Sequence, residues 1–176
     1  MQPERTSPRS IDTGSGDTVL FHTSIPADDP KRVAAVIAEL WHGRFLPFPP
    51  YPGAYVAVAG DARGTVIDVV PRGLEHRPAK GQFAVQINAT PSSYSHAHVA
   101  IGTLLSMEEI FGIAAREGWM AQRSDRGGLF EVIELWVENR FLLELLTDLQ
   151  QRRYVANLTA ETLEKVAGGN EGDGFA

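Results

Sequence analysis

The amino-acid sequence predicts an α+β protein made of tandem βαβββ modules that form a curved half-barrel sheet with helices outside, followed by a C-terminal helix. The first observation is a repeat: residues 97–101 and 140–146 correspond to residues 21–25 and 64–70 at an offset of 76 positions. The second is that strand-like and helical patterns follow one another in the same order in both halves. Because one such unit cannot bury both faces of its sheet, we expect the two units to pair.

Composition limits the possible function classes. The chain has 176 residues, of which 43% are hydrophobic, a net charge of −6, a pI near 5.3 and no cysteine. The acidic balance argues against nucleic-acid binding, and any metal must have nitrogen and oxygen ligands. Residues 1–17 lack the apolar run of a signal peptide, and no segment is long and apolar enough to cross a membrane. We therefore expect a cytoplasmic protein that binds neither nucleic acid nor membranes.

The first module is expected over residues 18–75, after a disordered tail at 1–17. Asp28, Asp29 and Pro30 suit the start of a helix, which apolar residues at helical spacing continue to Trp41. The proline-rich residues that follow are expected at the sheet edge, because proline cannot donate to a ladder. Strands are predicted at 18–25, 54–59 and 65–70.

The second module is expected over residues 94–147, after a connector at 76–93 that contains a further predicted strand at 83–87. Ser106 and Glu109 form a capping box at the start of its helix, which ends near Gly118. Leu149 opens the apolar pattern of a C-terminal helix, assigned to residues 148–166, and a second disordered tail follows at 167–176. Strands are predicted at 96–101, 120–124, 129–137 and 141–146.

Four ionisable residues recur at matching places in the two modules. His98 follows His22, and Glu144 follows Asp68, by the same 76 positions. If the modules are pseudo-symmetric, these side chains converge in one cavity, where two imidazoles and two carboxylates suit a divalent Mn, Fe, Co, Ni or Zn ion. Such an octahedral ion would keep two adjacent positions for water or for two neighbouring substrate oxygens. The alternative is a histidine–carboxylate hydrogen-bond network without metal.

Two further residues leave alternatives open. His96 lies two positions before His98, on the same face of the predicted strand, although the offset selects His98. If Glu138 and Asn139 form a two-residue turn, Glu131 shares the face of Glu144 and is a candidate additional acid or base.

The tandem βαβββ pattern resembles the vicinal oxygen chelate superfamily, which includes glyoxalases, bleomycin-resistance proteins and extradiol dioxygenases. The segment Gly60-Asp61-Ala62-Arg63-Gly64-Thr65-Val66-Ile67-Asp68 is similar to the family hairpin that ends in a glutamate ligand, with aspartate in its place. The resemblance covers residues 18–147. It implies a metal held by His22, Asp68, His98 and Glu144.

The resemblance also implies an activity. The ligand set is similar to that of bacterial glyoxalase I, a metal-dependent lyase in which a carboxylate carries the proton, a role that would fall to Glu144 or Asp68. Two alternatives are a non-catalytic binding protein of the bleomycin-resistance type, with a cleft lined by Trp136, Tyr55 and Phe130, and an extradiol-type dioxygenase. The expected partners are a small-molecule substrate and, as in related proteins, a second copy in a homodimer. The C-terminal helix would either cap the sheet or join that contact.

Overall fold

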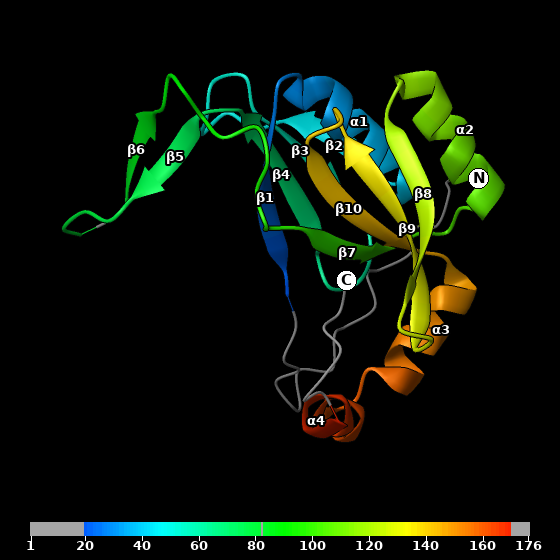
Figure 1. The fold of residues 1–176 in the computed structure, drawn as a ribbon. Helices are drawn as coiled ribbons and strands as arrows, with labels where there is room; N and C mark the ends of the chain where they lie inside the picture. The colour runs from blue at the N-terminus through cyan, green and yellow to red at the C-terminus, as the bar shows by residue number, and fades with distance from the viewer. Residues whose placement is uncertain (1–19, 82, 170–176) are drawn as a thin grey trace, which may run out of the picture.

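The computed structural model describes residues 20–81 and 83–169, so the predicted tail at 1–17 and most of the one at 167–176 lie outside it. The structure contains two four-stranded sheets and a separate two-stranded hairpin. The hairpin projects from the rest of the fold (Figure 1). The first sheet has the order β1-β4-β3-β2, with β1 (His22–Ala27), β2 (Arg44–Pro47), β3 (Tyr55–Val58) and β4 (Val66–Pro71). The second has the order β7-β10-β9-β8, with β7 (Val99–Gly102), β8 (Met120–Arg126), β9 (Phe130–Val137) and β10 (Phe141–Leu146).

The first and last strands of both modules pair in the same register. β1 runs parallel to β4, as β7 does to β10. Ser24 lies opposite Asp68 in the first sheet, and Ala100 lies opposite Glu144 in the second. Each partner moves by the same 76 positions from one module to the next. The sequence repeat is therefore a repeat of backbone pairing as well.

The third strand of each module is offset by 78 positions instead. Val56 on β3 lies opposite Asp68, whereas Glu134 on β9 lies opposite Glu144. The second module thus gains two residues before β9 and loses them again in the turn that leads to β10. Because strand side chains alternate between faces, a shift of two keeps every side chain on its own face.

The helices begin and end where the local sequence predicts. Asp29 accepts a backbone hydrogen bond at the start of α1, and Ser106 forms the predicted capping box with Glu109 at the start of α2. Gly118 ends α2 at a φ of 72°, a left-handed conformation that favours glycine. The bounds are α1 (Pro30–Leu40), α2 (Met107–Glu117), α3 (Asp148–Asn157) and α4 (Ala160–Gly169).

One hydrophobic core joins the two modules. It contains the helix-facing side chains of both sheets together with the apolar faces of α1 and α2, among them Ile25, Ile37, Ile67, Val69, Ile101, Ile110, Ile133, Leu135, Leu143 and Leu145. Burying a side chain of this size stabilises the fold by about 1.5–3 kcal/mol. Ion pairs also join the helices, with Arg32 at 2.5 Å from Glu117 and Arg116 at 2.6 Å from Glu39. The opposite face of each sheet is turned away from this common core.

The β9–β10 hairpin of the second module contacts the start of α1 in the first. Both carboxylate oxygens of Glu138 accept backbone hydrogen bonds, from Asp28 N at 2.6 Å and Asp29 N at 2.7 Å. Arg72 lies 3.3 Å from Glu138 and 2.6 Å from Asp28. The carboxylate therefore satisfies amides at a helix N-terminus, where negative charge is favoured.

The connector between the modules forms the projecting hairpin of Figure 1, with β5 (Leu74–Arg77) paired to β6 (Ala84–Ile87). The predicted strand at 83–87 is thus confirmed as β6. The hairpin contacts the loop before β3, where the hydroxyl of Tyr51 lies 3.1 Å from Nε2 of His76 on β5.

The C-terminal helix expected over residues 148–166 is divided in two. Leu158 leaves the helical conformation at φ −90° and ψ 67°, which ends α3. The hydroxyl of Thr159 then accepts a hydrogen bond from Thr162 N at 3.2 Å and caps α4. α3 covers one end of the second sheet, where the ring of Tyr154 lies 4.8 Å from that of Phe130. None of the helices in the described ranges combines the length and apolar character that a membrane crossing requires.

Candidate functional site

The second module brings its predicted pair together. His98 directly precedes β7 and Glu144 lies in β10, on the face turned away from the core. His98 Nε2 is 3.9 Å from Glu144 Oε2. His98 Nδ1 lies 3.2 Å from the carbonyl oxygen of His96, which can only accept, so Nδ1 carries the proton of that hydrogen bond. In the neutral ring, Nε2 therefore presents a lone pair toward a carboxylate oxygen.

The donor atoms of this pair fit a cation. Both His98 Nε2 and Glu144 Oε2 are electron-pair donors, and 3.9 Å is a separation that one ion with bonds of about 2.1 Å can bridge. Glu144 is 8% exposed, so its carboxylate needs a partner. Of the two histidines that the sequence leaves open, it is the side chain of His98 that faces Glu144, whereas His96 contributes its backbone oxygen.

A second acid and an arginine complete this cluster. Arg126 on β8 contacts Oε1 of Glu144 through Nη2 and, at 3.2 Å, through Nε. The same Nη2 donates to Glu134 at 2.9 Å, and Nη1 donates to Ser124 Oγ at 2.5 Å. Gln122 donates to the other oxygen of Glu134 at 2.7 Å. One guanidinium therefore bridges two carboxylates that face each other across β9 and β10.

The local environment favours the charged forms of Glu134 and Arg126. Burial raises the pKa of Glu134, but hydrogen bonds from Gln122 and Arg126 outweigh burial and lower it. Burial likewise lowers the pKa of Arg126, and its hydrogen bonds to Glu144 and Glu134 more than offset that effect. Glu134 is thus held as a carboxylate and is poorly suited to accept a proton at neutral pH.

The expectation for Glu131 is wrong. β9 and β10 pair Val137 with Phe141, which leaves three residues in the turn instead of two and shifts the register by one. Glu134 therefore lies opposite Glu144, and Glu131 falls on the other face, where Arg123 and Arg153 contact it. The alternation of side chains then excludes Glu131 from the face of Glu144.

The first module places its pair in different surroundings. Ser24 Oγ donates to Asp68 Oδ2 at 3.1 Å. His22 pairs with Val66 at the start of β1 and is exposed. Val56 stands opposite Asp68, at the place that Glu134 takes opposite Glu144. The first pair therefore has an apolar neighbour where the second has another acid.

Within a single chain the four predicted ligands do not form one cluster. Over residues 20–81 and 83–169, no group of three or more histidine, cysteine, aspartate or glutamate side chains is arranged to hold a metal ion. The reason lies in the packing, because the helix-facing side of each sheet belongs to the common core. His22 with Asp68, and His98 with Glu144, stand on the two faces turned away from it.

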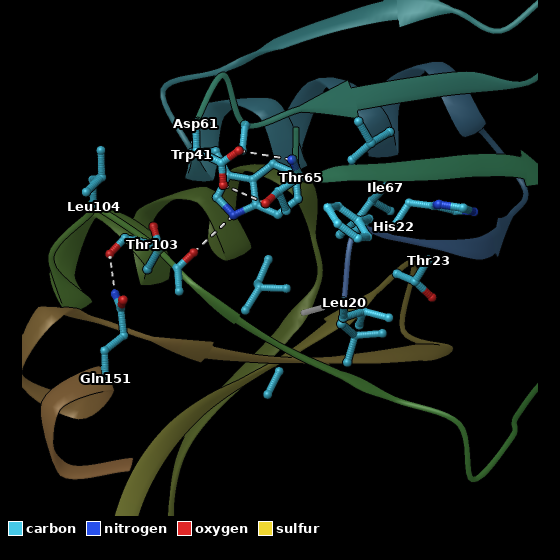
Figure 2. A pocket seen from close by; sticks show the side chains of 17 residues that line it. Leu20, His22, Thr23, Trp41, Asp61, Thr65, Ile67, Thr103, Leu104 and Gln151 are labelled. Atoms are coloured by element: carbon cyan, nitrogen blue, oxygen red, sulfur yellow. Dashed lines mark hydrogen bonds between the residues drawn. The ribbon is translucent and has the colours of Figure 1, made fainter. Parts of the chain in front are cut away.

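A cavity of about 530 Å³ opens between β1 and β7, beside His22 (Figure 2). Trp41, Ile67 and Ile101 contribute to its apolar wall, and Nε1 of Trp41 donates to Gly102 O at 3.0 Å. Its polar groups are largely engaged with one another: Thr65 Oγ1 donates to Asp61 at 2.5 Å. The cavity therefore suits the hydrocarbon or aromatic part of a small molecule.

The aromatic cleft expected for a binding protein is rearranged. Trp136 lies on the face of Glu144, as β9 pairing requires. Phe130 shares that face but is covered by α3, and Tyr55 packs against the common core on the opposite side of its sheet. These three residues therefore do not line one cleft within the chain.

Comparison with known proteins identifies the fold. No family model matches the chain, and no curated protein matches it in sequence. Among solved structures, it is similar to the fosfomycin resistance protein FosX of Listeria monocytogenes complexed with Mn(II) and sulfate ion, with a TM-score of 0.51 and 12% identity over 80% of this chain and 98% of that one. The hexagonal crystal form of that protein gives a TM-score of 0.50 and 13% identity over 78% and 99%.

A glyoxalase is a more distant structural neighbour. The glyoxalase I of Leishmania major has a TM-score of 0.46 and 16% identity over 87% of this chain and 99% of that one. With only 12% and 13% identity, the similarity between this chain and the two FosX structures is one of backbone arrangement. The chain therefore shares the fold of the FosX structures, which is the fold that its resemblance to the vicinal oxygen chelate superfamily implies.

Proposed function

We propose that the protein is a glyoxalase-like, metal-dependent lyase or isomerase that acts on a small substrate with two neighbouring oxygens. The observation that carries this proposal is the pair of electron-pair donors, His98 Nε2 and Glu144 Oε2, that face each other at 3.9 Å. The metal is a divalent Mn, Fe, Co, Ni or Zn ion, for which this donor set is suitable. When bound, it would act as a Lewis acid on the paired substrate oxygens.

The complete ligand set is His22, Asp68, His98 and Glu144, supplied as two pairs by two copies of the chain. The two pairs stand on faces that both turn away from one core, and neither pair alone provides four ligands. A homodimer in which the first sheet of one copy meets the second sheet of the other would complete two equivalent sites. The shared register of the two pairs supports such an arrangement.

The protein's own residues supply positioning and proton transfer. Arg126 contacts one oxygen of Glu144 and leaves Oε2 directed at His98, so this carboxylate is oriented before a substrate arrives. Asp68 keeps its second oxygen for a proton, since Ser24 donates to Oδ2 alone. Either carboxylate can carry a proton to or from a carbon next to a carbonyl group.

A second candidate is a binding protein of the bleomycin-resistance type without metal chemistry. It is favoured by the ion pair between Arg126 and Glu144, because the guanidinium already balances that carboxylate. In this case His98→Ala would leave ligand binding intact.

Elemental analysis of protein purified without an affinity tag tests the metal. The expected content after supplementation with Mn, Co, Ni or Zn is about one ion per chain, since two copies form two sites. His98→Ala should abolish binding, and His96→Ala serves as the matched control. A content well below one ion per chain in the native protein, or an equal loss in both variants, would contradict the proposal.

A mixing experiment tests the composite site. Homodimers of His22→Ala and of His98→Ala should each bind no metal. After exchange of subunits, each mixed dimer would hold one intact site, so about a quarter of all sites should recover. No recovery in dimers shown to have exchanged would place all ligands of a site in one chain and overturn the composite arrangement.

A further inference from the structure

The guanidinium of Arg126 occupies the centre of the acidic cluster on the second sheet. Its contacts run to Glu144, to Glu134 at 2.9 Å and to Ser124 at 2.5 Å. It comes from β8, whereas the acids come from β9 and β10, so the sheet itself brings the cation between them. The side chain is partly buried, which limits its screening by water.

The charges of this cluster differ from those of the first module. Glu134 and Glu144 lie directly opposite each other on neighbouring strands. Like charges in such a cross-strand pair repel unless a cation lies between them. In the first sheet Val56 faces Asp68, so no such repulsion arises. Only the second pair therefore combines a ligand carboxylate with a second acid and an arginine.

The arginine also limits what Glu144 can offer to an ion. Its Nε and Nη2 both contact Oε1, which leaves Oε2 as the oxygen that faces His98. A divalent ion bound between His98 and Oε2 would lie close to a fixed positive charge, and like charges at such distances repel. Binding of both carboxylate oxygens to one ion would require Arg126 to move away.

We propose that Arg126 supplies the positive charge that balances Glu134 and Glu144 when no metal is bound. A divalent metal ion that binds His98 and Glu144 must then overcome the repulsion of this charge. The arginine thus sets the metal affinity and keeps the acidic pair stable when no metal is bound. This inference rests on the metal site proposed above.

Titration calorimetry of the full chain with Mn²⁺ tests it. Arg126→Met keeps much of the side-chain length and removes the charge, so the affinity for Mn²⁺ should rise by at least about tenfold. Arg126→Lys keeps the charge and should stay within about threefold of the native protein. The matched control is Arg123→Met, which removes a neighbouring arginine of β8 that contacts Glu131 on the other face and should leave the affinity unchanged.

A second variant tests the same idea from the opposite direction if Arg126→Met does not fold. Glu134→Gln removes the other carboxylate that Arg126 contacts, so the guanidinium stays with Glu144 and the affinity for Mn²⁺ should fall. Circular dichroism of each variant establishes that the fold is retained.

The outcomes separate this inference from the proposed function. Equal or weaker binding in Arg126→Met, with native binding intact, overturns the role of Arg126 and leaves the metal site standing. If Arg126→Met binds Mn²⁺ and the native protein does not, the proposed role of Arg126 is supported and the proposed metal-dependent function of the native protein is contradicted. If neither protein binds Mn²⁺, both ideas fall.

Discussion

Removal of the Glu138 carboxylate tests how strongly the second module holds the first. In Glu138→Ala, the amides of Asp28 and Asp29 lose an acceptor at 2.6 and 2.7 Å, and Arg72 loses one of its two carboxylate partners. A hydrogen bond to a charged group contributes about 1.5–3 kcal/mol. Two such bonds therefore predict a loss of about 3 kcal/mol or more in the free energy of unfolding.

Glu138→Gln refines this prediction. Its single amide oxygen can accept from one backbone amide, while its NH₂ group would face the other, so the loss should be about half that of alanine. Urea unfolding at constant m-value measures both losses, and the midpoint of thermal unfolding should fall by about 6–12 °C for alanine. Glu164→Ala, at an exposed position of α4, is the control and should change stability by less than about 0.5 kcal/mol.

A small loss of stability in Glu138→Ala would contradict a tight contact between the hairpin and α1. If Glu138→Ala costs less than about 1 kcal/mol while the control behaves as expected, the two hydrogen bonds do not hold the hairpin to α1. Equal losses for alanine and glutamine would instead attribute the effect to charge alone.

Two further predictions concern backbone space and pH. A Cβ on Gly43 would lie 2.1 Å from the carbonyl oxygen of Val58, whereas one on Gly112 would meet nothing within 4 Å. Gly43→Ala should therefore lose more than about 2 kcal/mol in urea unfolding, and Gly112→Ala, inside α2, should gain about 0.5–1 kcal/mol; a similar result for both would contradict this. Burial raises the pKa of Glu117, but hydrogen bonds and ion pairs with its two arginines outweigh burial and lower it. The contribution of Glu117 to the free energy of unfolding is present above its ordinary pKa of 4.5 and is lost as the pH falls through the lowered pKa. The stabilities of native protein and Glu117→Gln should therefore differ at pH 7 and converge in acid, as measured by unfolding at each pH.

The fold was predictable from local patterns because the same order of strands and helix occurs once in each module. The capping box at Ser106 and the turn at Gly118 are local signals, and the structure confirms them. The offset between Asp68 and Glu144 likewise predicts equivalent places, which the shared register confirms. The break at Leu158 was not predictable from apolar spacing, because that spacing continues across it.

The chemistry of the second sheet depended on information that no local pattern contains. One extra residue in the turn after β9 replaces Glu131 by Glu134 on the face of Glu144. Arg126 could have been found by extending β8 from the predicted end at 124 to 126, where pairing with β9 carries it onto that face. Which of the two acids it contacts depends on side-chain reach, which the sequence does not contain.

The two-residue displacement of β9 relative to β3 bears on how this scaffold can change in length. A strand that slides along its neighbour by an even count presents the same side chains to solvent and to the interior. An odd slide would invert it, send Glu134 among the helices and expose Leu135. Insertions that move a strand are thus acceptable only in pairs, and a single added residue has to be absorbed entirely by a loop.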